Sequence, residues 1–293
     1  MKKNFLMTFI NHLIMIMGCL FLIIPVWLVF ASSTHAPEVI HQNGMQWTIG
    51  SIGLQGYKEV LSGLGIVNDV DIRRMLLNST IMGVGFAVGK VIISMLAAYG
   101  LVYFRFRGAS FIFAAIFATL LLPLEVRIGP SYEVMTIVGK TPIIGQYIGT
   151  NSYGGLIIPL IASATGTFYF RQFFKAVPDE LLEAAKLDNA GPFRFFKDIL
   201  LPLSRTMIAA IFIIMFVVGW NQYMWPLLMT TKSEYTTIVM GIQNIMTTIK
   251  ETNGPVPQYH RAFAMGILAL IPPVAVVMIF QRWFVKGLLE SEK

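Results

Sequence analysis

Cysteine is almost absent from the sequence. The one cysteine, Cys19, lies within a long apolar run. A single cysteine cannot close a disulfide within the chain and cannot supply a multi-cysteine zinc site, so both kinds of scaffold are excluded. The same residue gives no indication of the redox compartment.

Catalytic motifs are missing as well. Neither H-E-x-x-H nor G-x-S-x-G occurs, and the four histidines are dispersed through the first apolar segment and the loops. These histidines are His12, His35, His41 and His260. Without a nucleophile beside its base, or a pair of metal ligands, we expect no enzyme activity, no metal and no cofactor.

The sequence also lacks a phosphate-binding loop. Gly89-Lys90-Val91 contains the Gly-Lys pair of such a loop, but the earlier glycine position is occupied by Val84. Val91 supplies no hydroxyl for magnesium. Any ATP hydrolysis linked to this chain must therefore take place on another chain.

Charged residues are scarce: they make up 13% of the chain, whereas 56% of residues are apolar. A soluble domain has about 25% charged residues, and a bilayer core requires about 20 apolar residues per helical span. Six segments meet that requirement approximately: 6–31, 75–104, 110–124, 154–174, 206–228 and 262–284. The sequence predicts an all-α membrane protein in which residues 1–293 form a single transmembrane domain.

The first apolar segment follows Lys2 and Lys3, as in a signal peptide. Its apolar run is longer than the core of about 7 to 15 residues that a signal peptide has. We therefore expect a retained membrane anchor.

Lysine and arginine are unevenly divided between alternate loops. Thirteen of the 22 lie near the two ends and in segments 105–107 and 171–205, eight lie in the longer opposite loops, and Lys90 is the last. Because cytoplasmic loops retain positive residues, both termini and these two segments are predicted to be cytoplasmic. The same retention explains the net charge of +7, so we expect no nucleic-acid partner.

The longest cytoplasmic loop, residues 171–205, has the pattern of two short helices joined by a turn. Pro178 is typical of a first helical position, and Asp179 and Glu180 complement the positive end of a helix dipole. The first helix is therefore predicted to start near Val177.

The rest of this loop predicts the turn and the two helix faces. One face of the first helix holds, at helical spacing, Leu181, Ala184, Ala185 and Asp188. Asn189 tolerates the left-handed conformation that ends a helix. Pro192 opens a second helix, whose apolar face comprises Phe193, Phe196, Ile199 and Leu200. From pattern alone, this hairpin either packs against its own bundle or contacts another protein.

The loop resembles the EAA signature of ABC importer permeases, E-A-A-x-x-D-G-A followed by five free residues and F-x-x-I-x-L-P. The residues that match in register are Glu183, Ala184, Ala185, Asp188, Ala190, Phe196, Ile199, Leu201 and Pro202. Asn189 replaces the glycine of the signature. Because asparagine tolerates a positive φ better than most residues, we expect the turn to be kept.

This resemblance implies a type I ABC importer permease fold with a cytoplasmic coupling hairpin. In that family the hairpin sits in a groove of the ATP-hydrolysing subunit, so Glu183 would make the charged contact. Ala184 and Ala185 would pack closely, and Asp188 with Asn189 would form the turn. The implied partners are a second permease subunit, two copies of the ATP-binding subunit and a periplasmic or surface substrate-binding protein, in the bacterial inner membrane.

Other segments extend the resemblance over nearly the whole chain. Segments 219–228 and 281–289 are similar to the fifth span and the C-terminal tail of maltose-type sugar permeases. Segments 122–128, 171–174 and 291–293 look like those of glycerol-3-phosphate importer permeases. The expected cargo is sn-glycerol-3-phosphate, with glycerophosphodiesters as a further candidate and another sugar or polyol as the alternative. The coupling loop argues against a passive channel or a secondary transporter.

Charged residues within the predicted spans raise a choice between function and structure. Lys90 lies in the middle of its segment, where a lysine costs about 2.5 to 3.5 kcal/mol. It either stabilises an anionic substrate or pairs with a carboxylate such as Glu125. Glu125 and Arg127, just after Pro123, pose the same choice between the substrate pathway and a local ion pair or interfacial anchor.

The fifth predicted span holds a cluster of an amide and aromatic rings near an expected interruption at Pro226. The cluster consists of Asn221, Tyr223 and Trp225, with Trp220 beside it. These side chains either form an aromatic belt at the membrane interface or contact the substrate. On the second span, Gly85 and Gly89 have the spacing that permits close contact with another helix.

Overall fold

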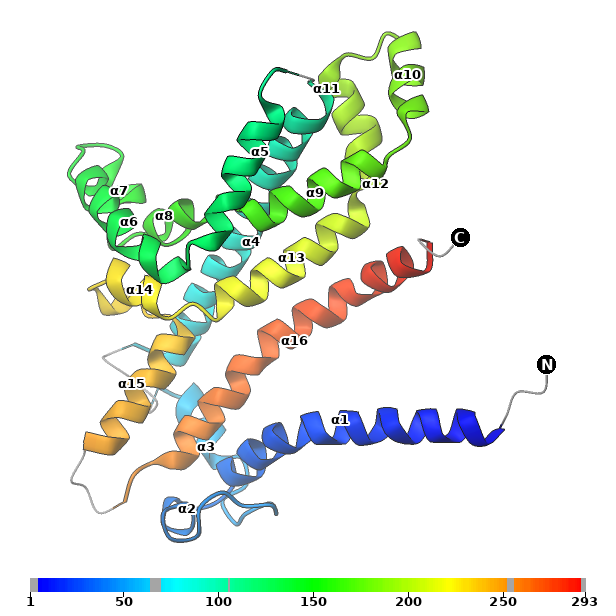
Figure 1. Ribbon diagram of the computed structural model, residues 1–293. Coiled ribbons are helices and arrows are strands. Elements are labelled where there is room, and N and C mark those ends of the chain that lie inside the picture. The colour runs from blue at the N-terminus through cyan, green and yellow to red at the C-terminus, as the bar shows by residue number, and fades with distance from the viewer. Residues whose placement is uncertain (1–4, 64–69, 105, 252–255, 291–293) are drawn as a thin grey trace. The chain divides into compact units, whose positions relative to one another are not determined.

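The computed structural model describes residues 5–63, 70–104, 106–251 and 256–290, and within these ranges every regular element is a helix or a helical turn (Figure 1). Contacts divide the chain into two compact units. The first unit comprises residues 1–75 and 240–271, and the second comprises residues 76–239 and 272–293. The division passes through two long helices, α4 and α16.

The first unit is built from the first helices and two later ones. Its elements are α1 (Phe5–Ser33), α2 (Pro37–Asn43), α3 (Gln55–Leu61), the start of α4 (Ile72–Tyr103), α15 (Ile238–Glu251) and the first part of α16 (Tyr259–Glu290). Buried serine and threonine side chains at the end of α1 and just after it accept hydrogen bonds from loop backbone: Gln46 N–H donates to Ser32 Oγ at 2.9 Å and Gly50 N–H to Thr34 Oγ1 at 2.7 Å. Side chains therefore satisfy polar backbone where no helix continues.

A charged cluster joins α3 to α16 within this unit. Arg261 Nε donates to a Glu59 carboxylate oxygen at 2.7 Å, and His260 Nε2 lies 3.3 Å from the same oxygen. Burial raises the pKa of Glu59, but hydrogen bonds from Arg261, Gln55 and His260 outweigh it and hold the pKa below its ordinary value. The carboxylate is thus ionised and paired.

The second unit holds the remaining elements. They are α5 (Ala109–Ala118), η1 (Thr119–Leu121), α6 (Leu124–Gly139), α7 (Gly145–Ile148), α8 (Tyr153–Ile157), η2 (Ile158–Leu160), α9 (Ala164–Ala176), α10 (Asp179–Leu187), α11 (Pro192–Phe195), the π-helical turn η3 (Phe196–Leu200), α12 (Leu201–Leu203), α13 (Arg205–Trp220), α14 (Met224–Met229) and η4 (Ser233–Tyr235). Most of α4 and the end of α16 also belong to this unit.

Six membrane spans are obtained when bent helix pairs count as one span each. Three helices are long and apolar enough to cross a bilayer alone: α1, α4 and residues Tyr259–Arg282 of α16. Three bent pairs supply the other spans. The pair Tyr153–Leu160 and Ala164–Ala176 bends by 51°, and the pair Pro192–Leu203 and Arg205–Trp220 bends by 72°. The predicted number of spans and the helical class hold, but three of the spans are bent helix pairs, whereas the sequence predicted an interruption only in the fifth.

The bends follow from local sequence. After η1, Pro123 takes an extended conformation and separates α5 from α6, so the third predicted span ends at Leu121. The fourth breaks at residues 161–163, where Ser163 caps α9 through its side chain. The fifth bends at Ser204, between α12 and α13, and the predicted segment 206–228 is interrupted again at residues 221–223 and not at Pro226, which lies buried inside α14. Proline is tolerated there because it falls in the first turn of that short helix.

Glycines let α4 approach the broken fourth span closely. A Cβ on Gly85 would meet the Ile157 side chain, and a Cβ on Gly89 would meet the Ile161 side chain. The two glycines are four residues apart and so are the two isoleucines, so the isoleucine side chains pack against the glycine surface of α4. The close contact predicted from Gly85 and Gly89 is confirmed.

Candidate functional site

The hairpin between α9 and α13 is formed as two short helices. Asp179 and Glu180 occupy the first turn of α10, as predicted, but Pro178 is its N-cap and Val177 ends α9, so the helix starts two residues later than expected. Pro178 has an extended backbone that cannot belong to a helical turn. Pro192 is the first residue of α11, as predicted.

Asn189 forms the turn of the hairpin with a φ of 51°. Ala190 N–H donates to the Ala185 carbonyl at 2.8 Å and Asn189 N–H to the Lys186 carbonyl at 3.1 Å. These bonds satisfy carbonyls that the end of α10 leaves free. The asparagine that replaces the glycine of the signature therefore adopts the expected left-handed conformation.

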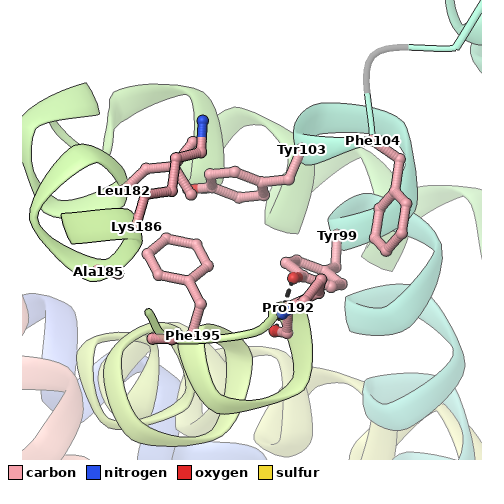
Figure 2. Close-up of a pocket in the computed structure, with 9 residues that line it drawn as sticks. Tyr99, Tyr103, Phe104, Leu182, Ala185, Lys186, Pro192 and Phe195 are labelled. Atoms are coloured by element: carbon pink, nitrogen blue, oxygen red, sulfur yellow. Dashed lines mark hydrogen bonds between the residues drawn. The ribbon is translucent and has the colours of Figure 1, made fainter. Parts of the chain in front are cut away.

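The inner side of the hairpin faces the end of α4 across a cavity of about 320 Å³ (Figure 2). The cavity is lined by Tyr99, Tyr103, Phe104, Leu182, Ala185, Lys186, Ala190, Pro192 and Phe195. The Tyr99 hydroxyl donates to the Pro192 carbonyl at 2.8 Å, and the Tyr103 hydroxyl donates to the Phe174 carbonyl at 3.2 Å. Two tyrosines of α4 thereby fasten the start of α11 and the end of α9.

The buried faces of the hairpin differ from those predicted. Of the four residues expected on one face of α10, only Ala185 is buried, and Leu182 joins it on the cavity wall. On the second helix Phe193 is 77% exposed, whereas Phe195 is 2% exposed and packs against Tyr103. Helical spacing predicts which residues share one face of a helix, but not which other element that face packs against. Here Phe195 is buried because it packs against Tyr103 of α4.

The outer side of the hairpin presents the rest of the signature. Glu183, Ala184, Asp188 and Asn189 are exposed, and Ala190 is partly buried. Leu187 is 86% exposed and flanks the turn with Phe193. A carboxylate, a small alanine and two large apolar side chains thus share a surface that no described part of the chain covers.

A second cavity, of about 230 Å³, lies among the spans of the second unit. Its polar lining consists of Lys90, Arg127, Ser131 and Gln222, and its apolar lining includes Phe86, Leu160 and Trp225. The two cations come from α4 and α6, and none of the lining residues that the structure describes is acidic. The cavity is therefore suited to an anion with an apolar or hydroxylated remainder.

Lys90 faces the break in the fourth span. Its ammonium donates to the Ala162 carbonyl at 3.4 Å and lies 4.5 Å from the centroid of the Phe86 ring. Four residues along α4, Ser94 Oγ donates to the Ser163 carbonyl at 3.3 Å. The break leaves carbonyls without helical partners, and α4 supplies donors to them. Among the residues whose side chains are described, Lys90 has no carboxylate partner.

The other predicted pathway residues differ in whether they line this cavity. Trp225 is fully buried, donates from Nε1 to the Leu156 carbonyl at 3.1 Å and lines the cavity. Asn221 is exposed and donates to the Val217 carbonyl at 2.9 Å, while Tyr223 is partly buried; neither lines the cavity. The side chain of Glu125 lies outside the described residues.

Ser131 and Gln222 line the cavity and were missed from the sequence. Ser131 follows Arg127 by four residues on α6, so helical spacing alone places both on one face. Gln222 directly follows Asn221, in the interruption between α13 and α14. Helical spacing from Arg127 could have identified Ser131, whereas the position of Gln222 depends on where the helix breaks.

Comparison with protein families gives one match, over most of the chain. The family described as "Binding-protein-dependent transport system inner membrane component" matches residues 89–290. This range includes Lys90, Arg127 and the whole hairpin.

Individual proteins match along the entire length. The sn-glycerol-3-phosphate transport system permease protein of Rhizobium meliloti (strain 1021) is 44% identical over 294 residues, covering 100% of this chain and 99% of that protein. The protein of the same name from Yersinia pestis bv. Antiqua (strain Antiqua) is 44% identical, with 96% of each chain covered.

Among solved structures, a bacterial ABC transporter involved in the import of the acidic polysaccharide alginate matches with a TM-score of 0.74. Sequence identity is 18%, and the match covers 97% of this chain and 98% of that one. The likeness confirms the predicted type I importer permease fold.

Proposed function

Because the chain belongs to the family of binding-protein-dependent transport system inner membrane components, we propose that its cargo is sn-glycerol-3-phosphate. The chain is a multi-pass permease subunit of an ABC importer, and its relatives at 44% identity are named as permeases for sn-glycerol-3-phosphate transport. Glycerophosphodiesters have the same anionic phosphate and are a further candidate. Another sugar or polyol is the alternative.

The observation that carries the proposal is that two cations, Lys90 and Arg127, line the same cavity. Two cations near each other in a membrane span are costly unless an anion neutralises them. A phosphate monoester carries a charge of about −1.5 to −2 and three acceptor oxygens, so it satisfies both cations at once. A neutral sugar would leave them uncompensated.

Two features of the cavity also fit the remainder of the cargo. Ser131 and Gln222 supply a hydroxyl and an amide for the glycerol hydroxyl groups, and Trp225 supplies an apolar wall. Glu125, Asn221 and Tyr223 remain proposals for other points on the pathway. The structural alternative for Lys90 is that it only satisfies the Ala162 carbonyl at the break.

Transport by a reconstituted importer tests the cargo. We expect Lys90→Met and Arg127→Met each to lower glycerol-3-phosphate uptake by roughly tenfold or more, because each removes a charge-assisted hydrogen bond. Lys140→Met, at an exposed lysine after the same helix α6, is the matched control. Uptake at the control level in both cavity variants contradicts the proposal, and failure of Lys90→Met to assemble supports the structural alternative.

We also propose that the hairpin, within residues 171–205, couples the spans to ATP hydrolysis on partner subunits. The chain itself would be no enzyme and would hold no cofactor. Glu183 would make the charged contact and Ala184 the close one, with Asp188, Asn189 and Ala190 shaping the turn. Ala185 would set the position of α10, because it is buried against the chain's own cavity.

The proposed assembly contains a second permease subunit, two copies of an ATP-binding subunit and a substrate-binding protein. With the hairpin on the cytoplasmic side, both termini would be cytoplasmic and residues 1–293 would form one transmembrane domain.

The coupling role is tested at the glutamate of the signature. We expect Glu183→Ala to lower ATP-driven uptake by about tenfold while cargo binding stays unchanged, because a charged contact to a partner contributes about 1.5 to 3 kcal/mol. Glu180→Ala, also exposed on α10, is the control. Equal uptake by the two variants would remove Glu183 from the interface.

A further inference from the structure

A third cavity, of about 340 Å³, lies at the hairpin end of α4, α5 and α9. It shares Tyr103 and Leu182 with the hairpin cavity, and its other charged or polar lining residues are Ser110, Arg171, Lys175 and Asp179. Neither the cargo nor the coupling role uses this cavity. Its polar groups come from α5 and α9 of the spans and from the first residue of α10 in the hairpin.

Arg171 is the residue in this cavity that lacks an acceptor. Its Nε is buried and has no hydrogen-bond partner in the part of the chain that the structure describes. The guanidinium carbon lies 3.9 Å from the centroid of the Phe113 ring, so the group is held in place by an aromatic face. A buried N–H without an acceptor costs about 1–3 kcal/mol, and native proteins rarely leave one. The site is therefore incomplete without an acceptor from elsewhere.

The surroundings of Arg171 favour an anion. Lys175, in the last turn of α9, adds a second cation, and Ser110 lies in the first turn of α5. The N-cap of α5 is Gly108, which provides no side chain, so the first-turn N–H groups and the helix dipole also attract negative charge. The carboxylate of Asp179 disfavours a bound anion, but within the described ranges no ion pair joins Asp179 to Arg171 or Lys175.

The neighbouring surface of α5 is apolar and faces outward. Phe111, next to Ser110, is 78% exposed, and no residue of α5 is buried. A phosphate at Ser110 would therefore lie directly beside an apolar surface. That combination is found in a phospholipid and not in free phosphate, and basic pockets at span ends suit anionic headgroups.

We propose that this cavity binds the phosphate group of an anionic phospholipid through Arg171, Lys175 and Ser110. The guanidinium donates its N–H groups to a phosphate oxygen, which reaches the buried Nε once the guanidinium turns toward the cavity, and the Lys175 ammonium and Ser110 hydroxyl donate to the others. The acyl chains lie along the exposed face of α5. This site is independent of the cargo proposal, because it shares no residue with the cavity of Lys90.

Lipid retention by the purified importer complex tests this site. The complex is washed in detergent micelles that contain either phosphatidylglycerol or phosphatidylcholine, and the bound lipid is counted by native mass spectrometry. We expect wild type to retain phosphatidylglycerol, and Arg171→Gln and Lys175→Gln each to weaken retention by roughly tenfold. Lys197→Gln, at an exposed lysine of the same hairpin, should retain it as wild type does.

Three outcomes overturn the proposal. Equal retention in all variants removes the site, and equal retention of phosphatidylcholine and phosphatidylglycerol removes the preference for an anionic lipid. If inorganic phosphate alone raises the melting temperature in an Arg171-dependent way and phosphatidylglycerol does not, the site takes free phosphate. Because Lys175 is exposed, its variant tests the site even where Arg171→Gln does not assemble.

Discussion

Two regions of the molecule treat their charged side chains in opposite ways. In the first unit, Glu59 is 16% exposed and contacts both Arg261 and His260. In the second unit, Lys90 and Arg127 line one cavity whose described walls include no carboxylate. One region completes its charges within the chain, and the other leaves them to be completed.

This difference separates charges that stabilise a fold from charges that serve a ligand. A paired group is satisfied whether or not the importer is working, so its loss is felt in stability. An unpaired group costs stability in the empty protein and is justified only by what it binds. Each region can be altered to resemble the other.

The largest effect is expected when the cavity is given the carboxylate it lacks. Gln222→Glu places an acid beside Lys90 and Arg127, so it should pair with them and exclude an anionic cargo. We expect glycerol-3-phosphate uptake to fall by about tenfold to a hundredfold, with an unchanged or higher melting temperature.

Gln146→Glu is the matched variant for this experiment, because Gln146 is exposed on α7 and lies outside the cavity. Its uptake should stay near the wild-type value. An equal loss in both variants would show that an added carboxylate lowers uptake from outside the cavity, and would contradict the role of the cavity.

The next effect comes from removing the pairing in the first unit. Glu59→Gln keeps the shape but leaves Arg261 and His260 without their carboxylate, so we expect a loss of about 1–3 kcal/mol in stability. Hydrogen exchange at the α3 amides measures it, and the affinity for cargo should not change. Glu133→Gln, at an exposed glutamate of α6, is the control.

A double variant distinguishes pairing from simple burial. If Glu59 and Arg261 act as a pair, the losses of Glu59→Gln and Arg261→Gln should fall short of adding, by at least about 0.5 kcal/mol. Additive losses would show that the contact is incidental.

The smallest effect is a pH dependence of the same cluster. The folded pKa of Glu59 is lowered, so its contribution to stability is fully present above its ordinary pKa and is lost as pH falls through the folded value. Protection of α3 should therefore hold from neutral pH to about 4 and decline below that. The Glu59→Gln variant should lack this component, and identical pH profiles for the two proteins would disprove it.

Sequence patterns predicted the helical class, the six spans and the identity of the hairpin because each depends on local or short-range spacing. Hydropathy located α1, α4 and α16, and the signature around Glu183 located the turn at Asn189. The breaks in the third and fourth spans were not predicted, because a helix break depends on what satisfies the freed carbonyls. At Ala162 the donor is Lys90, 72 positions away in sequence.

The cavity shows the same limit. The sequence singled out Lys90 as a charge within an apolar segment and Arg127 as a charge just beyond one, but only the fold shows that both line one cavity. Phe195 was left off the predicted face of the second helix for a similar reason, since its burial depends on contact with Tyr103 of α4. Spacing predicts faces, whereas contacts between faces require the fold.

The helix α4 carries both Lys90 and Tyr99, and this fixes their angular relation. An α-helix turns by about 100° and rises about 1.5 Å per residue. The nine residues from Lys90 to Tyr99 therefore place the two side chains on roughly opposite sides of α4, about 13 Å apart along its axis. One inserted residue between them would rotate Lys90 by about 100° relative to Tyr99. Segment 91–98 should therefore keep its length among related permeases, because its length keeps the two ends in phase.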